Sequence, residues 1–282
     1  FRVMQWNMLA QALSQGTDNF VKCPAEALSW DNRKLHIMEE ILTHNPTILC
    51  LQEVDQFNFL EKELGKVGYK GTFCKKPFSP CLDITPNFGP DGCAVFWKTS
   101  EVKEVKVENY IIKQKENYDT NQICILCCMK LKNIDSDIFV AVTHLKAKKY
   151  FNELRKQQSQ FIAKLLQEKC KNSPVILCGD FNADPQELAY KEMVTKDLNL
   201  NSAYTFLDNL HKEPAYTTLK IRGSPVGPLK NSATIDYIFF SLNHLKVTSL
   251  VRLPSEEEIG EDCLPSFTFP SDHLSLIADF HF

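Results

Sequence analysis

The feature that most constrains the fold is a series of short apolar runs separated by amphipathic segments. The runs are rich in β-branched and aromatic residues, which predicts β-strands. Several are apolar throughout, as are strands in sheets that are covered on both faces. The predicted strands cover 1–9, 47–54, 92–98, 121–131, 138–145, 174–181, 234–240 and 274–282.

Helical patterns separate these strands. The spacing of apolar residues predicts a helix over 24–43, with Pro24 in its first turn. The residues expected on its apolar face are Leu28, Leu35, Met38 and Leu42. Two further helices are predicted at about 150–170 and 186–196.

The elements follow one another without a linker, a repeat or a low-complexity segment. Residues 75–92 form the one long irregular stretch, and its four prolines predict a stiffened loop that serves a site. A length of 282 residues permits one or two domains, and one large core is within reach of such a chain. We predict a single domain over 1–282, an α/β sandwich of two packed sheets with helices outside.

Composition excludes several classes of protein. With 44% hydrophobic and 24% charged residues, the chain is neither disordered, collagenous nor a coiled coil. The 32 Lys and Arg against 35 Asp and Glu give a net charge of −3, which excludes a globally basic nucleic-acid coat but permits a local basic patch. No run approaches the roughly 18 apolar residues of a membrane helix, so no membrane span is expected. Because the chain begins at Phe1, we expect a trimmed domain that lacks any targeting segment.

The eleven cysteines do not indicate a disulfide scaffold, because their number is odd and the chain is long. Many lie inside apolar runs, as Cys50 and Cys178 do, which indicates buried, reduced thiols and an intracellular protein. Cys124 and Cys127 form a CxxC beside Cys128, but their run predicts a strand that would point them to opposite faces. Since no second pair has zinc spacing, zinc is not expected.

Polar residues with metal-binding or catalytic side chains recur at the ends of the apolar strands. Each alone has an ordinary explanation as a solvated strand end, a structural histidine or a turn residue. Their joint occurrence is informative because strand ends converge on one rim of an α/β sheet. They are Asn7, Glu53, His144, Asp180, Asn182, Asp236, Asp272 and His273.

The oxygen ligands in this set favour Mg²⁺ or Mn²⁺ over zinc. Glu53 is the best single ligand, and Asn7 is placed to orient the metal or a phosphate oxygen. Asp272 is a further candidate, either as a ligand of a second metal or as a support for the first.

The remaining members suit hydrolysis of a phosphoester. Asp180 can position and deprotonate a water. Asn182, His144 and His273 can stabilise the negative charge on phosphoryl oxygens. Asp236 can hold His273 in one orientation and favour its charged form.

These residues carry a resemblance to a known family. In this order, QWNML, LQEVD, THL, GDFNADP, TIDYIF and SDHLSL resemble the motifs of the exonuclease–endonuclease–phosphatase superfamily, in its deadenylase-type branch, over almost the whole chain. The resemblance implies a four-layer α/β sandwich with two mixed β-sheets flanked by helices. It also implies a Mg²⁺ on Glu53, for which Mn²⁺ can substitute, and the roles described above.

Four further segments are similar to one group within that branch: KPFSPCLD, GPDGCAVF, YTTLKIR and LPSFTFPSDHLSL. This similarity implies a phosphatase that removes the 2′-phosphate from NADP⁺ and NADPH, giving NAD⁺ and NADH. It also implies a monomer in the cytoplasm or mitochondria with a role in circadian rhythm.

Carried over by position, the substrate contacts of that group fall on Lys76, Lys146, Lys148 and Arg222. Lys148 stands where the group has an arginine, and it lacks the planar fork that binds phosphate with two hydrogen bonds. Leu219 replaces an aromatic residue, which would change adenine or ribose packing. The cations near the start of the second predicted helix, namely Lys149, Arg155 and Lys156, are expected on a solvated surface.

Two other functions remain open. The same site could belong to a poly(A)-specific 3′-exoribonuclease, which would need a basic track with stacking aromatics for RNA. The chain could also be a catalytically inactive RNA- or protein-binding module. The complete set of site residues argues against inactivity, and the mildly acidic charge favours a small dinucleotide over long RNA.

Overall fold

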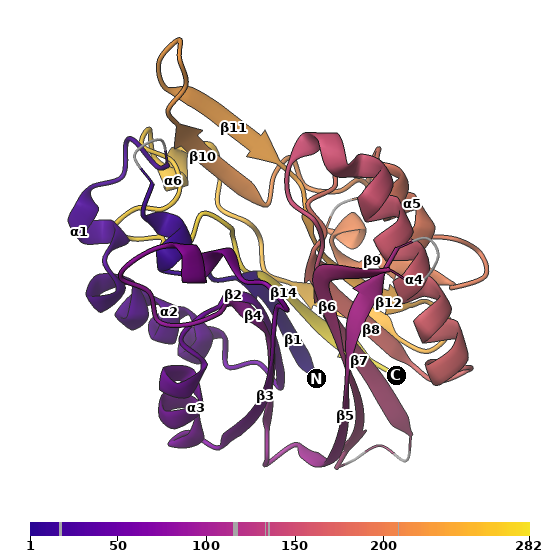
Figure 1. Cartoon of the computed structure of the whole chain (residues 1–282). Coiled ribbons are helices and arrows are strands. Elements are labelled where there is room, and N and C mark those ends of the chain that lie inside the picture. The colour runs from indigo at the N-terminus through magenta and orange to yellow at the C-terminus, as the bar shows by residue number, and fades with distance from the viewer. Residues whose placement is uncertain (17–18, 115–117, 133, 135, 208) are drawn as a thin grey trace.

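Two six-stranded mixed sheets pack face to face in the computed structural model, which describes residues 1–16, 19–114, 118–132, 134, 136–207 and 209–282 (Figure 1). The first sheet has the order β13 (Lys246–Leu250), β14 (Leu276–His281), β1 (Arg2–Asn7), β2 (Ile48–Val54), β4 (Gly92–Lys98), β3 (Tyr69–Lys75). The second has the order β5 (Val102–Lys113), β6 (Asp119–Leu131), β7 (Asp137–His144), β8 (Val175–Asp180), β12 (Asp236–Ser241), β9 (Leu200–Ser202).

A parallel pair of strands lies inside each sheet, β1 with β2 and β7 with β8, and antiparallel neighbours flank both pairs. A separate antiparallel hairpin of β10 (Thr218–Arg222) and β11 (Leu229–Ala233) projects from one end of the sandwich (Figure 1). Both chain termini lie at the opposite end.

Helices cover the outer faces of the sheets (Figure 1). The α-helices are α1 (Ala25–Leu28), α2 (Trp30–His44) and α3 (Phe57–Gly65) on the side of the first sheet, α4 (Asn152–Cys170) and α5 (Leu188–Met193) on the side of the second, and α6 (Glu256–Ile259) near the hairpin. Short 3₁₀ helices are η1 (Ala12–Ser14), η2 (Pro80–Asp83), η4 (Lys149–Phe151) and η5 (Ala203–Phe206). The predicted four-layer α/β sandwich is confirmed. None of the described helices is both long and apolar enough to cross a membrane.

The apolar strands bury both of their faces, as their sequences predict. Val3 packs into the core between the sheets, whereas its neighbour Met4 packs beneath the helices of the first sheet. Cys127 faces the core between the sheets and Cys124 packs on the side of α4, so the two lie on opposite faces of β6 as expected. All eleven cysteines are free thiols.

The helix predicted over 24–43 is interrupted, and its buried face is not the predicted one. Ser29, at φ −64° and ψ 141°, separates α1 from α2 and caps α2 by accepting from the Asn32 amide. Leu35 and Leu42 are 65% and 45% exposed, so the apolar face assigned to them is wrong. The buried residues of α2 are Arg33, Ile37 and Ile41. Because Arg33 is charged, the buried positions 33, 37 and 41 do not stand out as an apolar face in the sequence.

Several elements lie outside the sequence prediction, namely α3, α6, β3, β5, β9, β13 and the β10–β11 hairpin. β5 is an edge strand whose exposed face carries lysines and glutamates, so it lacks the apolar alternation that marks a strand. The loop predicted over 75–92 is largely irregular and contains only the short helix η2 between β3 and β4.

The close approach of β4 to β3 yields a test of the packing. A Cβ at Gly92 would lie 2.1 Å from the Cys74 carbonyl oxygen and 2.7 Å from Lys75 Cα. Both are backbone atoms of β3, so neither can move aside as a flexible side chain would. We expect Gly92→Ala to lower the free energy of unfolding by ~1–3 kcal/mol, the usual cost of overpacking. In α3, Gly65→Ala is the matched control, since its Cβ meets nothing within 4 Å and should leave stability equal or higher. Equal urea midpoints for the two variants would contradict the prediction.

Candidate active site

The site lies at one rim of the sandwich, where strand ends from both sheets meet. In the second sheet, His144 at the end of β7 and Asp236 at the start of β12 flank Asp180 in register. The first sheet contributes Asn7 at the end of β1 and Glu53 near the end of β2. Parallel strands end at the same rim, and an antiparallel strand begins there, which is why residues distant in sequence meet.

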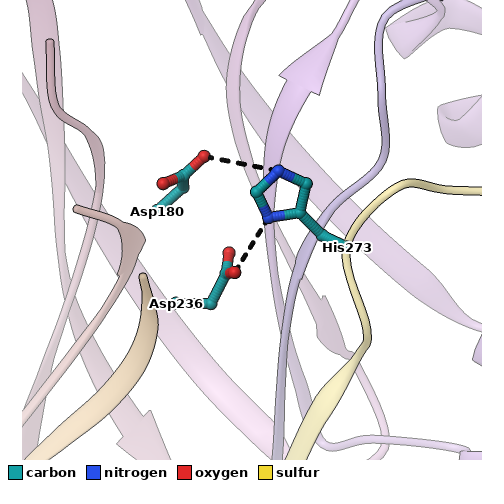
Figure 2. Close-up of side chains that lie close together, drawn as sticks. All are labelled: Asp180, Asp236 and His273. Atoms are coloured by element: carbon teal, nitrogen blue, oxygen red, sulfur yellow. Dashed lines mark hydrogen bonds and ion pairs between the residues drawn. The ribbon is translucent and has the colours of Figure 1, made fainter. Parts of the chain in front are cut away.

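Asp180, Asp236 and His273 form a buried group whose ligand-capable atoms lie within 4.8 Å of one another (Figure 2). His273 Nδ1 lies 2.8 Å from Asp236 Oδ2, and His273 Nε2 lies 3.9 Å from Asp180 Oδ2. Thr217 Oγ1 donates to Asp236 Oδ2 at 2.7 Å, and Gln5 Nε2 lies 3.3 Å from Asp236 Oδ1. The group therefore offers atoms that can hold a cation, and its aspartate–histidine pair is fixed from several sides.

Burial and neighbouring charges separate the proton affinities of this group. Burial alone would lower the pKa of His273, but the carboxylates of Asp236 and Asp272 raise it to about 9. Burial, reinforced by the charge of Asp236, raises the pKa of Asp180 to about 7. For His144, burial and the charges of Lys76 and His273 hold the pKa well below its usual value. At neutral pH the site thus pairs an imidazolium at His273 with a neutral imidazole at His144.

Glu53 is held in a strained backbone conformation. Its φ is +53°, and the pairing register of β2 with β4 shifts between Leu51 and Val54. A left-handed non-glycine residue costs ~1–2 kcal/mol, and such strain concentrates at functional sites. The Ala10 amide donates to Glu53 Oε2 at 3.2 Å. This hydrogen bond fixes the orientation of the carboxylate at the irregular end of β2.

The amide of Asn7 connects Glu53 to the buried group. Its Nδ2 donates to Glu53 Oε1 at 3.2 Å and to Asp180 Oδ2 at 2.9 Å, while its Oδ1 accepts from the Leu9 amide. Asn7 is fully buried and has its orientation set by these three bonds. Asn7 therefore holds the carboxylates of Glu53, from the first sheet, and Asp180, from the second, close to each other.

A cavity of about 500 Å³ opens onto these groups. The predicted residues that line it are Glu53, Lys76, His144, Lys146, Lys148, Asp180, Asn182, Arg222, Asp272 and His273. Asn7 and Asp236 do not line the cavity but lie behind it, bonded to Asp180 and His273 respectively. The structure thus brings every predicted site residue to one place.

The predicted substrate cations differ in their surroundings. Lys76 is nearly buried and lies 2.6 Å from the carboxylate of the fully buried Asp91. Burial opposes its charge, but Asp91 and Glu53 raise the pKa of Lys76, so it stays protonated. Lys146 Nζ lies 4.9 Å from the ring centre of Phe151, whereas Lys148 is exposed at the edge of the cavity.

Sequence reasoning missed one cation, Lys220. It lies on β10, lines the cavity and forms an ion pair with the Asp272 carboxylate. Burial opposes ionisation of Asp272, but Lys220 and His273 hold the pKa of this carboxyl well below its usual range. Lys220 and Arg222 are two residues apart on a strand and so share a face, a signal that could have identified Lys220.

Two expectations about nearby residues are wrong. Arg155 is not on a solvated surface but fully buried, whereas Lys149 is exposed and Lys156 half-buried. Leu219 does not line the cavity; it is fully buried and packs with Leu264 and Leu274. Leu219 therefore belongs to the core beneath the hairpin rather than to the wall of the cavity.

Comparison with known proteins agrees with this geometry. Residues 4–273 match the profile of the Endonuclease/Exonuclease/phosphatase family. The chain is 48% identical over 285 residues to nocturnin of Rattus norvegicus, with all of this chain and 65% of the relative covered. It is 45% identical over 286 residues to nocturnin of Xenopus laevis, covering 72% of that protein.

Among solved structures, the human nocturnin catalytic domain with a bound sulfate anion superposes with a TM-score of 0.85 at 40% identity, covering 100% of this chain and 94% of that one. The chain belongs to the endonuclease/exonuclease/phosphatase family and, within it, to the nocturnin group. It spans about 65% of the length of the rat protein.

The electrostatics of His273 can be tested directly. We expect Asp236→Asn to lower the pKa of His273 from about 9, because the carboxylate that raises it is gone while burial, which lowers it, remains. A ¹⁵N NMR titration of the histidine side chains in metal-free protein measures this shift. His281, exposed at the end of β14, is the reference signal that should not change between the two proteins. An unchanged His273 titration would show that Asp236 does not set its charge.

Proposed function

We propose that this chain is a divalent-metal-dependent phosphohydrolase that removes the 2′-phosphate of NADP⁺ and NADPH, yielding NAD⁺ and NADH plus phosphate. The observation that supports this most is the composition of the cavity wall. Glu53, Asp180 and His273 line the same cavity as the cations Lys76, Lys146, Lys148, Lys220 and Arg222. The proposed hydrolytic groups and the proposed phosphate-binding cations thus face one cavity.

The shape and charge of the cavity suit a small, highly phosphorylated substrate. Its volume of about 500 Å³ lies within the ~300–1,000 Å³ of small-molecule sites. Lysine and arginine side chains bind phosphate oxygens through charge-assisted hydrogen bonds. The human catalytic domain binds a sulfate anion, a tetrahedral oxyanion with the shape of a phosphate group. We propose that the cavity of this chain holds a phosphate group.

The donor set fits a hard divalent cation, for which Glu53 is the proposed holder, with its carboxylate oriented by Asn7. Both oxygens of Asp236 already have protein partners, namely His273 and Thr217 on one and Gln5 on the other. Glu53 has one partner on each oxygen, and Asp180 beside it carries a raised pKa. Oxygen ligands near unneutralised negative charge favour Mg²⁺, with Mn²⁺ as a substitute. When bound, the ion would polarise a phosphoryl oxygen and offset negative charge in the transition state.

The protein groups have the protonation states that hydrolysis needs. Asp180, with a pKa of about 7, can take a proton from an attacking water near neutral pH. The His273 imidazolium can donate to a phosphoryl oxygen, and its ring is held by Asp236. His144 lines the cavity, where its neutral imidazole can form a hydrogen bond with a substrate oxygen. Asn182 Nδ2 donates to the Leu145 carbonyl at 3.1 Å and retains a second hydrogen for substrate.

We further propose that the protein works as a monomer in a reducing intracellular compartment, either the cytoplasm or the mitochondria. Eleven free thiols support a reducing environment, because disulfides form and persist in oxidising ones.

A paired assay on one preparation tests the activity. With Mg²⁺ present, we expect release of inorganic phosphate from NADP⁺, and a drop of at least ~100-fold in kcat/KM for Glu53→Gln, because the amide lacks the negative charge that holds the metal. Glu168→Gln, on the exposed side of α4, is the matched control and should retain full activity. Shortening of oligo(A) to AMP with NADP⁺ unchanged would favour a 3′-exoribonuclease. Inertness toward both substrates with Mg²⁺ or Mn²⁺ would favour a binding module.

The role of Lys148 gives a second test. We expect Lys148→Arg to lower KM for NADP⁺ about fivefold, since a bidentate guanidinium adds about one hydrogen bond worth ~1 kcal/mol. Lys164→Arg on the exposed surface of α4 should leave KM unchanged. Equal KM values for wild type and Lys148→Arg would remove this side chain from the substrate site.

A further inference from the structure

Arg33 and Arg155 are among the largest fully buried side chains of the described residues, and both serve the active-site rim without lining its cavity. Arg33 lies on α2 and Arg155 on α4, on opposite outer sides of the sandwich (Figure 1). Burying a guanidinium is costly unless its donors are satisfied. What these donors bind therefore indicates what each arginine does.

Arg33 joins two segments that carry the proposed catalytic groups. Its Nη2 donates to the carbonyls of Met8 and Leu9, which directly follow Asn7. Its Nε donates at 2.6 Å to the Pro270 carbonyl, in the segment that leads to Asp272 and His273. Asn7 comes from the N-terminal strand and His273 from near the C-terminus. The guanidinium of Arg33 thus forms hydrogen bonds with both of these segments.

The first of these segments is held further through Gln11. Arg33 Nη1 donates at 2.9 Å to Gln11 Oε1, and the backbone N–H of Gln11 donates at 2.8 Å to Asp55 Oδ2. The network therefore ends at Asp55, two residues after the proposed metal ligand Glu53.

Arg155 makes the equivalent connections in the other half of the molecule, among segments that carry substrate cations. Its Nη1 donates to the carbonyls of Lys146 at 3.1 Å and Lys148 at 2.8 Å. Its Nη2 and Nε donate to Glu187 Oε2 at 2.6 and 3.2 Å. Lys148 has a φ of +80°, a conformation that an L-residue rarely adopts, and its carbonyl is held by Arg155.

We propose that Arg33 and Arg155 are positioning residues with divided roles: Arg33 sets the geometry of the catalytic groups Asn7 and His273, and Arg155 sets the geometry of the substrate-binding lysines 146 and 148. The proposal rests on the phosphohydrolase function above. A lysine cannot replace either arginine, since its single ammonium cannot reach acceptors in two segments at once. For Arg33 these acceptors are carbonyls near Asn7 and near Asp272. For Arg155 they are the carbonyls of Lys146 and Lys148 and the carboxylate of Glu187.

The kcat and KM of the variants Arg33→Lys and Arg155→Lys test whether the two arginines have these separate roles. We expect Arg33→Lys to lower kcat by ~10–100-fold with KM for NADP⁺ changed less than about threefold, because groups supporting a catalytic site typically have effects of this size. For Arg155→Lys we expect KM to rise ~10-fold with kcat within about twofold. Arg2→Lys is the control: Arg2 also binds a carboxylate, Asp279, and a carbonyl, that of His44, but at the far end of β1. It should change neither constant.

Amide hydrogen exchange on the full chain gives a readout that needs no substrate. Faster exchange confined to 8–11 and 270–273 is expected for Arg33→Lys, and confined to 145–149 for Arg155→Lys. A uniform rise across the chain in either variant, or the same ratio of kcat to KM effects in both, would overturn the division of roles. Should wild type release no phosphate from NADP⁺, the proposed function fails, while the exchange pattern still decides whether each arginine holds its segments.

Discussion

The hydrogen bond from Asn7 to Asp180, at 2.9 Å, ties the first sheet to the second at the rim where the site lies. Asp180 is buried, and its register neighbours His144 and Asp236 place three titratable groups side by side. Such a cluster is unfavourable unless every lone pair has a partner or a cation is near. The hydrogen bonds to Asp180 therefore form only if the two sheets keep their relative position. The close-packed core between the sheets holds them in that position.

Charges of both signs line the cavity at this rim. The carboxylates of Glu53, Asp180 and Asp272 and the His273 imidazolium share its wall with Lys76, Lys146, Lys148, Lys220 and Arg222. Lys76 and Lys220 each pair with a buried aspartate. For Lys76, the charges of Asp91 and Glu53 raise the pKa although burial alone would lower it. This arrangement fits the proposed phosphohydrolase, in which the cations would bind a phosphorylated substrate and the carboxylates would hold a divalent metal. The two buried arginines extend the arrangement outward by holding the loops that carry it.

Much of the site was predictable because its chemistry is concentrated at strand ends. Glu53, His144 and Asp180 each end an apolar run, and convergence of strand ends needs no knowledge of loop geometry. The helix face on α2 was not predictable in the same way, since the buried row contains Arg33 and two leucines outside it are exposed. Lys220 was missed because β11, the partner of its strand, lacks an apolar pattern, so the hairpin was not predicted. Arg155 was missed because a charged residue on a helix is ordinarily solvated.

The sequence by itself determined the class of fold and indicated most of the residues that meet at the rim, because hydrophobic periodicity is local and the polar residues stand at the ends of the apolar runs. Only the tertiary structure decided which partner each polar group has. It placed Asn7 between Glu53 and Asp180, gave Asp272 to Lys220, and turned Arg33 and Arg155 inward. Those pairings depend on contacts between segments far apart in the chain, and the free energy of burying a charge is set by such contacts rather than by neighbours in sequence.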